Sequence, residues 1–185
     1  PVSLAMLAVV LGSGAVLPMP GLTFITFVAL AGLAQIIATS LLIYAFTLRN
    51  FTVGTAYSKT ETVQTAIFGT LLLAEPLTLW AWIGVGISLF GVWVLSIRGD
   101  AKGLRNILLG WTQKSALVGI ASGGCFAVAA VSIRVASLSL PEGDFVIRAI
   151  LTLAVMNSLQ VVMLGSWLAL RERDQLVRVV LTWRS

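Results

Sequence analysis

Hydrophobic residues along this chain are grouped into six long runs, which are separated by short polar or proline-containing segments. The runs cover about residues 2–17, 22–48, 53–74, 77–97, 115–137 and 145–170. A helix of roughly 20 apolar residues spans the hydrocarbon core of a bilayer, which is about 30 Å thick. The pattern therefore predicts an all-α integral membrane protein with six transmembrane helices.

The segments between the runs carry residues that end helices. Pro18–Gly21 contains two prolines and a glycine, and Glu75–Pro76 turns the chain between the third and fourth runs. The loop of residues 98–114 is longer and polar. The basic tail, residues 171–185, forms either an interfacial amphipathic helix or the start of another span. The first run is short and begins at the first residue, so we expect a fragment of a longer protein.

The composition is typical of a membrane protein, and the distribution of the basic residues indicates its topology. The chain is 58% hydrophobic and 10% charged, whereas soluble domains carry about 25% charged residues. Its mean hydropathy is +1.02. Alternating helices place most of the basic residues that give the net charge of +5 on one side: Arg49, Arg98, Lys102, Arg105, Lys114, Arg171, Arg173, Arg178 and Arg184. By the positive-inside rule that side is cytoplasmic. The long uncharged runs, each long enough to span a bilayer, exclude a nucleic-acid-binding module in spite of the basic surplus.

Reactive side chains are too scarce for most enzyme chemistry. The chain has no histidine, which excludes Ser-His-Asp and Cys-His catalysis and imidazole-based zinc sites. The single cysteine, Cys125, excludes disulfide frameworks and cysteine-rich metal sites. A pair such as Ser58–Lys59 is the remaining, distant route to an intramembrane enzyme. We therefore expect neither an enzyme nor a bound metal or cofactor.

Lys59 and Glu61 lie about six and eight residues inside the third apolar run. Charged groups at membrane depth are costly unless they face a cavity or a partner, so both are candidates for the solute or coupling-ion path. Two positions apart on a helix, they cannot form an i,i+4 ion pair. The structural alternatives are that Lys59 reaches the cytoplasmic headgroups and that Glu61 pairs with an arginine of another helix.

Five uncharged polar residues also lie inside the predicted spans. They are Gln64 in the third, Asn157 and Gln160 one turn apart in the sixth, and Gln35 and Tyr44 in the second. Each either joins two helices through a hydrogen bond or lines a polar cavity together with Glu61.

Small residues recur on single faces of the fourth and fifth spans. The fourth has Gly84, Ser88 and Gly91 on one face, and the fifth has the stripe Gly119, Gly123, Ala127 and Ala130. Such stripes let helix backbones approach closely, so we expect static helix packing rather than sliding surfaces.

Residues 44–97 resemble the end of one repeat of the EamA-type transporters in the drug/metabolite transporter superfamily. The resemblance rests on three segments: Tyr44–Arg49, Leu71–Thr78 with its Ala-Glu-Pro turn, and the glycine-rich helix Trp82–Leu95. Residues 114–170 look like the first two helices of the following repeat, with Arg148 at a position where that second helix often carries an arginine.

The resemblance implies a ten-helix bundle of two inverted five-helix repeats. Residues 1–97 would be the C-terminal four helices of the first repeat, 98–114 the loop between repeats, and 115–170 the first two helices of the second. The family moves metabolites or drugs by alternating access. Its usual topology implies that the loop 98–114 lies outside, whereas the distribution of basic residues predicts that it lies inside.

Together these features favour a secondary transporter for a small metabolite or drug-like solute in the bacterial inner membrane. Its expected partners are the solute, the lipid bilayer and a second copy of the chain. The alternative is a non-transporting membrane scaffold, in which every polar residue joins helices.

Overall fold

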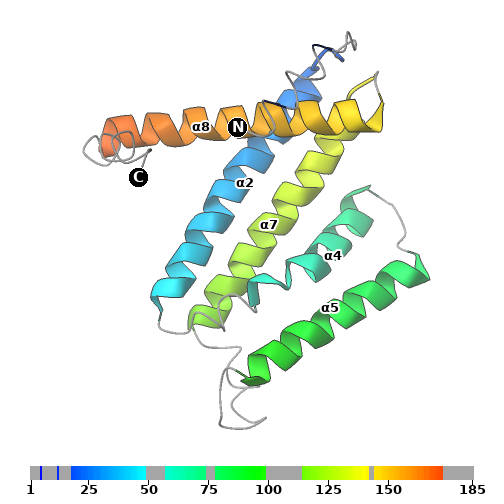
Figure 1. The fold of residues 1–185 in the computed structure, drawn as a ribbon, viewed down its shortest axis with the longest axis vertical. Coiled ribbons are helices and arrows are strands. Elements are labelled where there is room, and N and C mark those ends of the chain that lie inside the picture. Colours follow the sequence, from blue (N-terminus) through cyan, green and yellow to red (C-terminus); the bar gives the residue numbers. More distant parts are fainter. Residues whose placement is uncertain are drawn as a thin grey trace. The chain divides into compact units, whose positions relative to one another are not determined.

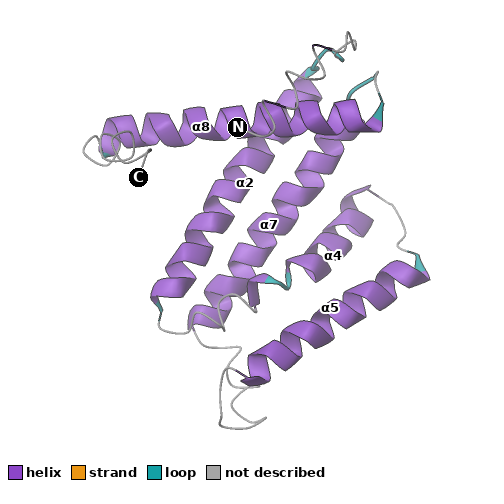
Figure 2. Ribbon diagram, in the orientation of Figure 1, coloured by secondary structure: helices purple, strands orange, loops and turns teal. Residues whose placement is uncertain are grey.

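The computed structural model describes residues 18–48, 57–73, 78–98, 114–141 and 144–172, together with Ala5 and Gly12. This part of the chain is helical and contains no strand (Figure 2). Its five helices, labelled in Figure 1, are α2 (Leu22–Thr47), α4 (Glu61–Leu73), α5 (Leu79–Arg98), α7 (Lys114–Leu138) and α8 (Phe145–Arg171).

Several predicted features lie outside the described residues. They are most of the first apolar run, the basic loop between α5 and α7, and the tail after Glu172. The predictions of a first transmembrane helix, a cytoplasmic loop and an interfacial tail therefore stay predictions.

Three helices are long and apolar enough to cross a membrane: α2, α7 and α8, with mean hydropathies of 2.0, 2.0 and 1.8. The apolar stretch Leu79–Gly91 of α5 is shorter. α4 has 13 residues, which extend about 20 Å at 1.5 Å per residue. The prediction of one continuous helix from residue 53 to 74 is wrong, because α4 begins at Glu61 after a turn at Lys59 and Thr60.

The chain divides into two units, and α2 and α7 contribute to both. The first unit consists of residues 1–32 and 136–185. Its core contains Phe24 and Val28 of α2 together with Ala154 and Met156 of α8. A Cβ at Gly32 would lie 3.4 Å from the Gln160 Cγ atom, so the glycine lets α8 approach the α2 backbone.

The second unit, residues 33–135, contains an antiparallel contact between α2 and α7. The Ser122 hydroxyl donates to the Ala38 carbonyl at 2.8 Å, and the Lys114 ammonium lies 5.6 Å from the centroid of the Tyr44 ring. Ala38 precedes Tyr44 in α2, whereas Ser122, which contacts Ala38, follows Lys114, which contacts Tyr44, in α7. The two helices therefore run antiparallel. α4 and α5 contact each other in the same unit.

Small side chains form the buried surface, and large apolar side chains cover the outside. Ala38 of α2 and Ala116 and Ala127 of α7 are fully buried, whereas Leu71 of α4 and Ile87 of α5 are largely exposed. This arrangement suits a bilayer, because lipid is as apolar as leucine and close backbone packing has to hold the helices together.

Candidate solute-binding site

The chain turns sharply just before α4. Tyr57 and Ser58 are helical, Lys59 and Thr60 form a turn, and the helix continues from Glu61. The Thr60 amide donates to the Tyr57 carbonyl at 3.1 Å, and the Thr60 hydroxyl donates to the same carbonyl at 2.6 Å. The Thr60 carbonyl then accepts from the amides of Val63 and Gln64, both at 3.0 Å. These bonds satisfy backbone groups that a helix end would otherwise leave without partners.

Two adjacent glycines of α7 pack against this turn and the first residues of α4. A Cβ at Gly123 would lie 2.8 Å from the Ser58 carbonyl oxygen and 3.1 Å from the Glu61 amide nitrogen. A Cβ at Gly124 would lie 2.8 Å from the Gln64 Oε1 atom. Since real Cβ atoms do not approach backbone atoms so closely, only glycine at position 123 allows α7 to lie against the turn at this distance. At position 124 the nearby atom is the end of the Gln64 side chain, which can rotate away.

Gln64 joins α4 to α7. Its Nε2 atom donates to the Thr60 hydroxyl at 2.9 Å and to the Ile120 carbonyl at 3.3 Å. A hydrogen bond to an α7 carbonyl beside the glycine pair fixes the rotation of α4. Gln64 therefore acts in this structure as a bond between helices, which is one of the two roles that the sequence left open.

Lys59 and Glu61 do not occupy the helix interior that the sequence predicted. Lys59 is exposed in the turn, and Glu61 is half-buried in the first turn of α4. A carboxylate in the first turn is favoured by the positive end of the helix dipole. The expectation that both residues project from one continuous helix is wrong, because the chain turns between Ser58 and Glu61.

The remaining predicted path residues lie in both units. In the second unit, Gln35 is half-buried and Tyr44 is exposed beside Lys114. In the first unit, Asn157 is half-buried, and the Gln160 Nε2 atom donates to the Gly32 carbonyl at 3.3 Å. Gln160 thus joins α8 to α2. The prediction that these residues share one cavity with Glu61 stays a prediction.

The small-residue stripes behave differently on the two helices. Gly119 and Gly123 of α7 are buried. On α5, Gly84 and Gly91 are exposed and Ser88 is half-buried, and a Cβ at either glycine would meet no described atom within 4 Å. The packing role of the α5 stripe stays a prediction.

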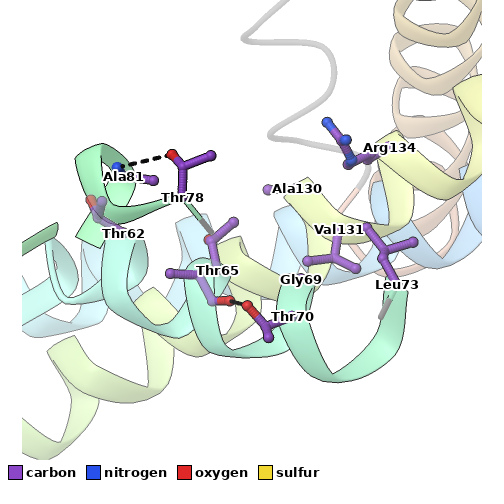
Figure 3. Close-up of a pocket in the computed structure, with 11 residues that line it drawn as sticks. Thr62, Thr65, Gly69, Thr70, Leu73, Thr78, Ala81, Ala130, Val131 and Arg134 are labelled. Carbon is purple, nitrogen blue, oxygen red and sulfur yellow. Dashed lines mark hydrogen bonds between the residues drawn. The ribbon is translucent and has the colours of Figure 1, made fainter. Parts of the chain in front are cut away.

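A pocket of about 440 Å³ lies in the second unit, bounded by α4, the start of α5 and the C-terminal part of α7 (Figure 3). One face of α4 supplies more than half of its lining. The lining residues are Thr62, Thr65, Ala66, Gly69, Thr70, Leu73, Thr78, Ala81, Ala130, Val131 and Arg134. The volume falls within the range of about 300–1,000 Å³ that is typical of small-molecule sites.

The pocket combines small apolar walls with hydroxyl groups and one guanidinium. Figure 3 shows Thr62, Thr65 and Thr70 on α4 and Arg134 on α7. Thr78, just before α5, accepts a hydrogen bond from the Ala81 amide at 3.3 Å. The hydroxyl groups of this arrangement can hold a small polar solute by hydrogen bonds.

The sequence analysis missed this site because it gave priority to charged residues and amides. A detectable signal was present, since Thr62, Thr65 and Thr70 are spaced i, i+3 and i+8 and therefore share one face of a helix. In the sequence, Arg134 is recognisable only as a charged residue near the end of the apolar run 115–137. Lys59, Glu61 and Gln64 do not line the pocket.

The helices of the fold define the class of protein. Apolar helices of bilayer-spanning length make the chain an integral, multi-pass membrane protein. Within the described ranges, no group of three or more acidic, histidine or cysteine side chains could hold a metal ion.

The comparison with family models identifies the family. The model of the EamA-like transporter family matches residues 2–97, just over half of the chain, and the chain belongs to this family. The family consists of transporters rather than enzymes. Neither the curated proteins nor the solved structures gave a match.

Proposed function

We propose that this chain is part of a secondary transporter that moves a small metabolite or drug-like solute by alternating access, and that the pocket between α4, α5 and α7 holds the solute. The pocket is the observation that carries the proposal. It places hydroxyl groups and a guanidinium among helices that are otherwise apolar, and polar groups at such sites are typical of solute pathways. Membership of a transporter family supports the same conclusion.

The proposal includes an architecture of ten helices in two inverted five-helix repeats. Residues 1–97 are assigned to the first repeat, 98–114 to the loop between repeats, and 115–170 to the second. The end of the family match at residue 97 supports the boundary between the first repeat and the loop. We propose the bacterial inner membrane as its location; the apolar helices support the coarser statement that the protein is integral to a membrane.

Glu61 is proposed as a coupling-proton or solute site and Lys59 as an electrostatic partner for an anionic group. Both lie beside the turn that packs against Gly123, in the unit that contains the pocket. Interrupted helices at membrane depth form solute and ion sites in many transporters, which supports a role for this turn. Gln35, Tyr44, Gln64, Asn157 and Gln160 are proposed as hydrogen-bonding residues along the path.

A proton-flux experiment on the full-length protein tests this proposal. Proteoliposomes containing the pH dye pyranine are mixed in turn with amino acids, nucleosides, sugars and organic acids. We expect at least one solute to change the internal pH, and we expect Glu61→Gln to abolish that change while Arg171→Gln preserves it. Lys59→Met is expected to weaken the apparent affinity for the solute.

Two results would count against the assignment in different ways. Unchanged uptake and pH dependence in both the Glu61 and Lys59 variants would remove those residues from the mechanism. Failure of every solute to move would favour the scaffold alternative, for which the hydrogen bonds from Gln64 to Ile120 and from Gln160 to Gly32 are the supporting observation.

A further inference from the structure

Gly69 is the one glycine among the described residues that line the pocket between α4, α5 and α7. It lies on the α4 face that borders the pocket, with Thr65 one turn before it and Leu73 one turn after it (Figure 3). The residue is half-buried. A side chain at position 69 would therefore project from the middle of the wall that α4 contributes to the pocket.

Close helix packing does not explain a glycine at this position. A Cβ at Gly69 would meet no described atom within 4 Å, whereas a Cβ at Gly123 would lie 2.8 Å from a backbone oxygen. Glycine inside a helix also costs stability relative to alanine, because its backbone loses more conformational freedom on folding. The missing side chain at position 69 thus leaves space in the pocket that no described residue fills.

The direction of helical side chains indicates which part of the pocket a larger residue would take. Cα–Cβ bonds tilt toward the N-terminus of a helix, so a side chain at position 69 would extend over the preceding turn. That turn carries Thr65 and Ala66, which both line the pocket. A leucine at position 69 would therefore take up space between the α4 wall and any solute that lies against these two residues.

The hydroxyl groups near this space can serve solutes of either hydrogen-bonding character. The Thr70 hydroxyl donates to the Ala66 carbonyl at 2.9 Å, so its oxygen remains able to accept. The Thr78 oxygen accepts the Ala81 amide at 3.3 Å, so its O–H remains able to donate. Hydrogen bonding at these two threonines therefore selects solutes less sharply than the space available to them.

We propose that Gly69 sets the upper size limit of the solute that the pocket holds. The solute places an apolar part against the Gly69 backbone and Ala66, and its polar atoms lie toward the threonine hydroxyls. A pocket accommodates a group only where its wall leaves room, because overpacking of an apolar site is unfavourable. This inference rests on the proposed transport function and names a residue that determines its specificity.

Uptake of solutes of different size into proteoliposomes of the full-length protein tests this limit. The radiolabelled probes are three pairs of a smaller and a larger solute: alanine and phenylalanine, ribose and adenosine, and lactate and citrate. Gly69→Leu is expected to lower the uptake of every larger solute that the wild-type protein moves by at least about tenfold. A smaller solute that the protein moves should lose less than about twofold, and Gly69→Ala should have an intermediate effect.

The matched control is Gly86→Leu on α5. Gly86 is exposed and does not line the pocket, and a Cβ there would also meet no described atom within 4 Å. This variant should leave uptake of both members of each pair unchanged. The thermal unfolding midpoint of Gly69→Leu should be at or above that of the wild type, since leucine is the better helix former.

Three results would overturn the inference. Gly69→Leu might leave the uptake of a larger solute unchanged, it might lower both members of a pair equally, or it might lower the unfolding midpoint. The last result would show that Gly69 is needed for packing and not for the size of the pocket.

Thiol labelling separates this inference from the proposed function, because it needs no transported solute. Gly69→Cys and Gly86→Cys are each placed in a full-length background without other cysteines, which includes Cys125→Ser. The reagents are N-methylmaleimide and the larger N-(1-pyrenyl)maleimide, which are both uncharged. At position 69 the larger reagent should react at least about tenfold more slowly than the smaller one, relative to the same ratio at position 86.

The two assays distinguish the possible failures. A size limit in the labelling of position 69, without movement of any solute, would keep the inference about the pocket and contradict transport. Equal ratios at positions 69 and 86 would overturn the size limit, and movement of a solute in the same preparation would keep the transport proposal.

Discussion

At the scale of single residues, Gly123 decides how closely the turn before α4 approaches α7. Gly123 and Gly124 have no side chain where the Ser58 carbonyl and the Gln64 amide group approach α7. Their neighbour Ser122 is also fully buried and donates to a backbone carbonyl. A single added carbon at Gly123 would push against backbone rather than against a flexible side chain. The contact can therefore be tested with the smallest possible substitution.

Gly123→Ala is expected to destabilise the protein by about 1–3 kcal/mol, because the new Cβ would force the turn away from α7. The matched control is Gly86→Ala on α5, where a Cβ meets nothing within 4 Å in the described residues. That change should be neutral or stabilising by up to about 1 kcal/mol, since alanine is the better helix former. Intrinsic tryptophan fluorescence during thermal unfolding in detergent measures both. Equal midpoints for the two variants would contradict the close contact at Gly123.

At the scale of elements, hydrogen bonds between nearby residues define both ends of α8, whereas the start of α4 also depends on a contact with another helix. Asp144 begins α8 with an extended backbone, φ −64° and ψ 153°, and its carboxylate accepts the Phe145 amide at 2.8 Å. The Glu172 amide closes the other end by donating to the Leu168 carbonyl at 2.8 Å. Both ends follow from nearby residues. The start of α4 differs, since its turn also lies against α7.

Asp144→Ala should therefore lower stability modestly, by about 1 kcal/mol, because it removes the N-cap acceptor of α8. Asp144→Asn keeps an oxygen that can accept the same amide and should retain most of the stability. Thermal unfolding midpoints of the two variants provide the measurement. If the asparagine variant is as unstable as the alanine variant, the effect comes from the lost charge and not from the cap.

At the scale of the whole molecule, membrane topology follows from the distribution of basic residues. Lys102 belongs to the basic loop between α5 and α7, and Pro141 lies in the turn between α7 and α8. Because α7 is long enough to cross the bilayer, these two positions are expected on opposite sides. The positive-inside rule places Lys102 in the cytoplasm, whereas the usual topology of the family places that loop outside.

Cysteine labelling distinguishes the two orientations. Cys125→Ser removes the single native thiol, and Lys102→Cys or Pro141→Cys then introduces one new site per variant. With a membrane-impermeant maleimide on intact cells, the thiol at 141 should react, and the thiol at 102 should react only after lysis. The reverse pattern would show that the basic loop is outside.

Hydrophobic patterning alone located most of the helices. The predicted runs at 22–48, 77–97, 115–137 and 145–170 correspond to α2, α5, α7 and α8 within about two residues at each end. Length and hydropathy are local properties, and in a bilayer an apolar segment has to satisfy its own backbone hydrogen bonds by forming a helix. The membrane class and the family resemblance were therefore within reach of the sequence.

The interruption before α4 and the pocket were decided by tertiary structure. Residues 53–74 read as one apolar run, yet the chain turns at Lys59, where Gly123 lies more than sixty positions further along. Gln64 meets Ile120 across 56 positions, and Arg134 joins the threonines of α4 only through the packing of α7. Hydropathy is a local property of the sequence and does not show which distant residues contact each other. Steric fit between those residues determines which polar groups lie together.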